Sequence, residues 1–159
     1  TASAISNALD DLPEFFLIQY GDTILDINYK DFLNRSKCFK EFLLMAIYKN
    51  KTLLDQNNVI LEKDKLTYIN SEEFKNNQIN IPTNYIDYGL LGCNKKFMKK
   101  YYNILNENNS LKHFQSEISK KELILPYIVE KQFYEIGTIK AYKAFIDNFK
   151  LGKMKHMLE

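Results

Sequence analysis

Two acidic residues that lie far apart in the sequence each follow an apolar segment typical of a β-strand. Asp22 comes directly after Tyr20-Gly21, and Glu135 lies within the segment 133–138 (FYEIGT). An acid at the carboxyl end of a strand lies where open α/β sheets bind their ligands. Two carboxylates that converge there suit Mg²⁺, which draws its remaining ligands from water and substrate phosphates. The two segments therefore predict a divalent cation site beside a bound phosphate.

The elements that would position these acids alternate between strand and helix. Nearly continuous apolar segments are typical of strands buried on both faces, and apolar residues at helical spacing separate them. The expected strands are 15–20, 42–48, 85–93 and 123–129. The expected helices are 29–37, 95–105, 111–119, one that Thr1 caps at its start, and one that begins at Gly137-Thr138 with Ala141, Tyr142, Phe145, Ile146 and Phe149 as its apolar face. This order predicts an α/β fold of three Rossmann-like layers, in which helices flank a mixed, mostly parallel sheet.

The middle of the chain predicts a small insertion. Residues 59–62 and 65–69 flank Lys63-Asp64 and suit a β-hairpin on the surface or edge of the main sheet. Pro126 places the strand 123–129 at a sheet edge, because proline cannot donate to a strand ladder. No repeat, low-complexity tract or linker divides the chain, so we expect one domain over residues 1–150 and a tail over 151–159.

Composition narrows the function further. The 159 residues carry a net charge of +2, and Arg35 is the only arginine, which disfavours nucleic acid as a partner because arginine is the usual reader of bases and phosphates. No apolar segment approaches the roughly 20 residues that span a bilayer, so we expect no membrane partner and a cytoplasmic location. Cys38 and Cys93 are too few for a disulfide framework, and neither His113 nor His156 lies at a catalytic spacing.

Three segments, in the same order, resemble the sugar-1-phosphate nucleotidyltransferases, a family with a glycosyltransferase-A-like fold. The segment 16–27 (FLIQYGDTILDI) resembles the family's apolar strand followed by Gly-Asp-Thr. The segment 85–89 (YIDYG) resembles its sugar-site strand, and 133–138 resembles its second acidic motif. The resemblance covers essentially the whole chain but only the later part of a family member. It implies a partial nucleotidyltransferase domain that lacks the N-terminal strands of the family fold.

The resemblance also implies a reaction. A sugar 1-phosphate attacks the α-phosphate of a nucleoside triphosphate, pyrophosphate leaves, and Mg²⁺ neutralises charge at the phosphates. Asp22 and Glu135 match the two positions that hold the metal, so they are the expected catalytic residues. The implied substrate contacts are Tyr20, Gly21, Tyr85, Asp87, Tyr88 and Gly89. Such an enzyme supplies precursors for capsule, lipopolysaccharide or other cell-surface glycans.

Two departures from the family pattern bear on activity. Family members begin with a glycine-rich, arginine-containing loop and a Pro-Lys-Pro-type segment that hold the triphosphate, and these 159 residues contain neither. Many relatives also carry a phosphate-binding lysine after the hairpin, where this chain has Glu72 and Glu73, with Lys75 as the nearest replacement. We therefore expect the chain to be inactive alone and to need an N-terminal segment. The sheet edge left by its absence makes a homodimer a secondary hypothesis.

Three other interpretations stay open. A cytidylyltransferase that acts on a small non-sugar phosphate is one, because Glu72 and Glu73 do not look like a sugar-phosphate clamp. A catalytically silent relative that regulates or scaffolds an active partner is another, favoured by the absent phosphate loop. The third is an α/β binding module whose acids match the motifs by chance. Whether Asp22 and Glu135 face the same space separates this last interpretation from the others.

Overall fold

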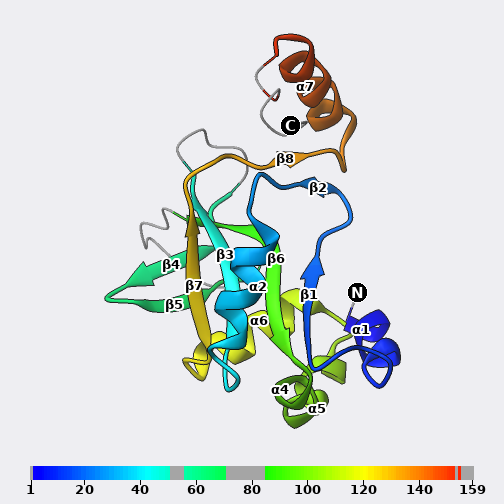
Figure 1. The fold of residues 1–159 in the computed structure, drawn as a ribbon, viewed down its shortest axis with the longest axis vertical. Helices are drawn as coiled ribbons and strands as arrows, with labels where there is room; N and C mark the ends of the chain where they lie inside the picture. Colours follow the sequence, from blue (N-terminus) through cyan, green and yellow to red (C-terminus); the bar gives the residue numbers. More distant parts are fainter. Residues whose placement is uncertain (1, 51–55, 71–84, 153, 155–159) are drawn as a thin grey trace.

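A central strand, β6, organises the sheet in the computed structural model, which describes residues 2–50, 56–70, 85–152 and 154 (Figure 1). β6 (Tyr85–Asn94) is paired on both sides within a six-stranded sheet, and a separate ribbon joins two short strands. The sheet order is β5 (Lys65–Tyr68), β4 (Val59–Glu62), β6, β3 (Leu43–Lys49) and β7 (Ile124–Val129), with β1 (Phe15–Gln19) also paired to β6. The ribbon consists of β2 (Thr23–Ile24) and β8 (Tyr134–Glu135). The α/β class, the mixed sheet and the hairpin are confirmed.

Polar side chains set where several of the helices begin. Asn28, Asn94, Ser110 and Thr138 each accept a hydrogen bond from a backbone N–H of the first turn, which satisfies donors that would otherwise lack a partner. The helices are α1 (Ala2–Ala8), α2 (Tyr29–Lys37), α4 (Lys95–Lys100), α5 (Tyr102–Glu107), α6 (Leu111–Lys120) and α7 (Ile139–Lys150). The expected cap at Thr1 lies outside the described residues. No helix in the described ranges combines the length and apolar character needed to cross a membrane.

The helix expected over 95–105 is in fact two helices. Tyr101 leaves the helical conformation, with φ −107° and ψ 23°, and separates α4 from α5. Its ring packs 4.8 Å from that of Phe97, centroid to centroid. Periodicity alone predicted one helix, because the apolar spacing continues through the break.

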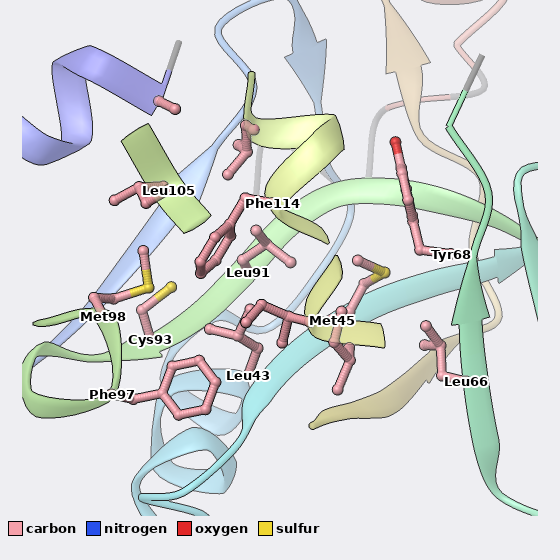
Figure 2. Close-up of a cluster of buried hydrophobic side chains, with 14 of the residues drawn as sticks. Leu43, Met45, Leu66, Tyr68, Leu91, Cys93, Phe97, Met98, Leu105 and Phe114 are labelled. Carbon is pink, nitrogen blue, oxygen red and sulfur yellow. The ribbon is translucent and has the colours of Figure 1, made fainter. Parts of the chain in front are cut away.

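The two faces of the sheet pack against two separate core clusters. Along β3, Leu43, Met45 and Ile47 belong to the first cluster, and Leu44, Ala46 and Tyr48 to the second, as the alternation of side chains along a strand requires. Figure 2 shows Leu43 and Met45 of the first cluster beside Leu91 of β6 and Phe114 of α6. The second cluster contains Phe32 of α2. The sheet is therefore the middle layer between α2 and α6.

Strand direction differs from the expected mostly parallel sheet. Among the described pairs only β3 and β7 are parallel, whereas β1, β3 and β4 all run antiparallel to β6. β1 and β3, which α2 connects, point the same way but are separated by β6. A strand buried on both faces is continuously apolar in either direction, so the sequence pattern did not reveal its orientation.

Two local expectations are confirmed. Pro126 lies in β7, which is the edge strand next to β3. Lys63 and Asp64 both have positive φ, 49° and 68°, as the two-residue turn of a tight hairpin requires. The polar loop with Glu72, Glu73 and Lys75 lies outside the described residues.

We predict that Gly92→Ala destabilises the fold, because α2 packs closely on β6 at this glycine. A Cβ at residue 92 would lie 2.5 Å from Ser36 Oγ and 2.7 Å from Ser36 Cβ. Forcing α2 outward should lower the free energy of unfolding by about 1–3 kcal/mol. Urea unfolding measures this loss.

Gly21→Ala is the matched control. Apart from its chain neighbours, no described residue has a heavy atom within 4 Å of a Cβ at residue 21, so the same added methyl group should change the free energy of unfolding by less than about 0.5 kcal/mol. Equal losses in the two variants would contradict the packing argument.

Candidate functional site

A cavity of about 1070 Å³ contains both sequence-predicted acids in its wall. Asp22 and Glu135 line it together with three further residues that we expected to bind substrate, namely Tyr20, Gly21 and Asp87. The wall includes the carboxyl end of β1, the middle of α1, the start of α6, strand β8 and one face of α7. Residues far apart in the sequence, from Ala4 to Asn148, thus line one cavity that is open to solvent.

Three other expected substrate contacts lie outside this wall. Tyr88 is fully buried in the second core cluster, where its ring lies 5.3 Å from that of Phe133. Tyr85 packs against the first cluster. Gly89 has φ +83°, and a Cβ there would lie 3.1 Å from the ring of Tyr20, so this glycine supports a wall residue from behind. Contact of these three residues with a substrate stays a prediction.

The β2–β8 ribbon brings the two acidic segments together. Thr23 pairs with Glu135 and Ile24 with Tyr134 in antiparallel register. One step further, the backbone N–H of Ile136 donates to the carbonyl oxygen of Asp22 at 2.8 Å. Asp22 and Glu135 therefore occupy neighbouring positions on adjacent backbone segments.

Gly137 provides the space that the Asp22 side chain occupies. A Cβ at residue 137 would lie 2.6 Å from Asp22 Oδ2, so the Asp22 side chain would have to shift. Any larger residue at position 137 would therefore shift the Asp22 side chain or the backbone beside it. This contact joins the two acidic motifs through side-chain packing as well as through backbone pairing.

The charges on the wall suit a divalent cation. The acids Asp22, Glu135 and Asp87 line the cavity with two bases, Lys112 and Lys140. No salt bridge to Asp22 or Glu135 occurs within the described ranges, and no group of three or more histidine, cysteine or acidic residues there could enclose a metal. Two carboxylates fit Mg²⁺ at a site where phosphates and water supply the other ligands.

Asp87 differs from the other two acids because protein groups donate hydrogen bonds to both of its carboxylate oxygens. Tyr20 donates its hydroxyl to Asp87 Oδ2 at 2.7 Å, Gln115 donates Nε2 to the same oxygen at 3.1 Å, and Gly89 donates its N–H to Oδ1 at 2.8 Å. Burial raises the pKa of the Asp87 carboxyl, and these hydrogen bonds offset part of the rise. Burial and the neighbouring Asp87 raise the pKa of the Tyr20 phenol well above its usual value, so the hydroxyl stays a donor.

The sequence reasoning missed the contribution of α7 to the wall. The cavity is lined by Thr138, which caps α7, and by Lys140, Ala141, Ala144, Phe145 and Asn148 of the helix itself. The sequence predicted an apolar face on this helix, but none of its residues is buried, and Tyr142 and Phe149 are 51% and 46% exposed. The reason is that the ribbon carries α7 away from the main sheet (Figure 1). The signal available was the recurrence of Thr138, Ala141 and Phe145 at helical spacing directly after the acidic motif.

The fold of this chain resembles those of solved proteins from two bacteria. A protein from Bacillus anthracis described as a glucose-1-phosphate thymidylyltransferase, solved with sucrose, has a TM-score of 0.69 and 10% identity over 91% of this chain and 58% of its own. HddC from Yersinia pseudotuberculosis, also solved with GMP-PN, has a TM-score of 0.62 and 18% identity over 94% of this chain and 62% of its own. No family model and no curated protein matches the sequence. The chain therefore has the fold of part of a sugar-1-phosphate nucleotidyltransferase, and it spans about three fifths of these proteins.

We predict that Gly137→Ala displaces the Asp22 carboxylate. The added methyl group overlaps Asp22 Oδ2, so the side chain or the ribbon must move. The amide resonances of Asp22 and Ile136 should shift more than those of residues in β7. Gly21→Ala, which adds a methyl group in open space next to Asp22, should leave the Ile136 resonance in place. Similar shifts in both variants would contradict the conclusion that the Asp22 carboxylate occupies the space beside Gly137.

We predict that Asp87 makes stability depend on pH. Its pKa in the folded state is raised above the ordinary value of 3.8, so between these two pKa values the folded state holds a proton that the unfolded chain has lost. Its contribution to the free energy of unfolding is therefore full below about pH 4 and is lost as pH rises through the folded-state pKa. The difference in this free energy between wild type and Asp87→Asn, from urea unfolding, should decline with pH. A difference that stays constant from pH 4 to 8 would contradict this assignment.

Proposed function

We propose that the chain contributes the metal and sugar-phosphate side of a nucleotidyltransferase site, at which a nucleoside monophosphate is joined to a sugar 1-phosphate. The observation that carries the proposal is the convergence of Asp22 and Glu135 on one cavity through the β2–β8 ribbon. The fold shared with nucleotidyltransferases supports the same kind of reaction. We assign the product to cell-surface glycan synthesis, as the resemblance of the motifs implies.

The reaction is an in-line displacement at phosphorus. An oxygen of the sugar 1-phosphate bonds to the α-phosphorus of the triphosphate, the bond from that phosphorus to the bridging oxygen breaks, and pyrophosphate leaves with the electron pair. Bound Mg²⁺ supplies neutralisation of the phosphate charge and alignment of the reacting oxygens. Asp22, which lies directly before β2, and Glu135 of β8 would hold this ion. Lys112 and Lys140 would add positive charge to the same space.

The substrate contacts divide into two groups under this proposal. Tyr20 and Gly21 lie on the wall next to Asp22 and are the direct contacts with the sugar phosphate. Tyr85, Tyr88 and Gly89 shape the central strand beneath them. The acidic pair Glu72-Glu73, which favoured a non-sugar phosphate, lies outside the described residues, so no structural observation favours the cytidylyltransferase alternative.

A binding assay tests the proposal most directly, because we expect binding without turnover. The 159 residues contain no glycine-rich, arginine-containing loop to hold a triphosphate. We predict that the chain binds Mn²⁺ in the presence of glucose 1-phosphate. Asp22→Asn and Glu135→Gln should each weaken Mn²⁺ binding by on the order of tenfold or more, since even residues that only support metal ligands cost this much. Electron paramagnetic resonance of free Mn²⁺ measures the affinity.

Asp11→Asn is the control, because Asp11 is an exposed acid outside the cavity wall. It should leave the Mn²⁺ affinity unchanged. An equal effect of all three substitutions would show that Mn²⁺ responds to net charge and not to the site. Binding of glucose 1-phosphate without any Mn²⁺ site would favour the catalytically silent relative, and pyrophosphate release by the chain alone would disprove the expected inactivity.

A further inference from the structure

The polar side-chain atoms of Asp87 and Tyr20 form hydrogen bonds with other groups of the protein. Both oxygens of the buried Asp87 carboxylate accept hydrogen bonds, from Tyr20, Gln115 and Gly89, and its own backbone N–H donates to Asn58 Oδ1 at 2.9 Å. The Tyr20 hydroxyl lies inside this network, since Gln115 Nε2 also donates to it at 3.1 Å. Neither group has a free polar atom of obvious use to a ligand, although both residues line the cavity.

Tyr20 is also the first residue of the turn that carries Asp22. Its carbonyl oxygen accepts from Thr23 Oγ1 at 3.0 Å and from the Thr23 N–H at 3.4 Å. Its own N–H donates to the Gly89 carbonyl oxygen at 3.0 Å, and its ring lies against Gly89. Backbone, ring and hydroxyl therefore fix Tyr20 to β6 at three points, and the turn begins at this fixed residue.

Burying a carboxylate costs free energy unless hydrogen bonds satisfy its oxygens. A buried Asp87 is therefore best explained by a role in positioning its hydrogen-bond partners. A Tyr–carboxylate hydrogen bond is directional and charge-assisted, whereas an apolar contact at the same place would let the ring slide. The hydrogen bond of 2.7 Å from the Tyr20 hydroxyl to Asp87 Oδ2 fixes the position of the Tyr20 side chain. The turn 20–23 begins at this residue, so its position is fixed as well.

We infer that Asp87 is a positioning residue, which holds Tyr20 and through it the turn that presents Asp22, and that Tyr20 offers a ligand its ring and not its hydroxyl. This replaces our expectation that Asp87 contacts substrate directly. The part concerning Asp22 as a metal ligand rests on the proposed function; the part concerning the turn does not.

Hydrogen exchange of the full chain tests the positioning without any ligand. Tyr20→Phe removes only the hydroxyl, and the amide of residue 20 and the amide of Ile136, which donates to Asp22, should exchange about tenfold faster. The amide of Leu43, which donates to Leu123 in the body of the fold, should keep its rate. Tyr102→Phe is the matched control, because Tyr102 is 42% exposed and does not line the cavity. Acceleration at Leu43 equal to that at Ile136 would overturn the inference, since it would indicate global destabilisation.

Binding measurements separate positioning from ligand contact. Tyr20→Phe and Asp87→Asn should weaken Mn²⁺ binding several-fold more than they weaken the binding of glucose 1-phosphate without metal. An equal loss of metal-free glucose 1-phosphate affinity in Tyr20→Phe would overturn the inference, because the hydroxyl would then contact the ligand. If the wild-type chain binds neither Mn²⁺ nor glucose 1-phosphate, the proposed function fails, and the exchange rates at residue 20 and Ile136 still decide the positioning role.

Discussion

The pairing of β2 with β8 is the interaction on which the candidate site depends. Each strand is only two residues long, and an isolated ribbon of this size has little stability in water. It persists because both ends of the ribbon are attached to packed structure. On one side the turn 20–23 is fixed to β6 through Tyr20, and on the other Phe133 packs against Tyr88 in the second core cluster. The position of both acids is thus determined by the core beneath them.

Most elements of the fold were predictable because local physics determines them. Continuous apolar segments predicted β1, β3, β6 and β7, and proline placed β7 at the edge. The tight turn at Lys63-Asp64 followed from the two short strands around it. Strand direction and the break at Tyr101 were not predictable, because neither changes the apolar pattern of the sequence. The direction depends on which strand lies between β1 and β3, and contacts between residues far apart in the sequence determine this.

The candidate site was predictable only in part, for a related reason. The acids were identifiable because each follows a strand, and the structure places both on one cavity. The segment 85–89 was harder, since a strand buried on nearly every residue carries aromatic and small residues for packing as well as for binding. Tyr88 serves the core, Gly89 makes room for a ring, and Asp87 satisfies Tyr20. One sequence pattern therefore covers three different physical roles.

The segment 133–138 shows how a short motif can be determined entirely by its neighbours. Phe133 anchors the segment in the core, and the Tyr134 ring lies 6.0 Å from that of Phe145, which attaches α7 to the ribbon. Glu135 faces the partner strand at Thr23 and lines the cavity.

The rest of the segment serves Asp22 and the following helix. Ile136 donates its N–H to the Asp22 carbonyl oxygen, and Gly137 leaves space for the Asp22 carboxylate. Thr138 caps α7 by accepting from the Ala141 N–H at 3.1 Å. Every position from 133 to 138 thus has a contact that fixes either the core, the other acid or the helix that completes the wall. The two acidic segments are therefore packed against each other at Gly137 as well as paired through their backbones.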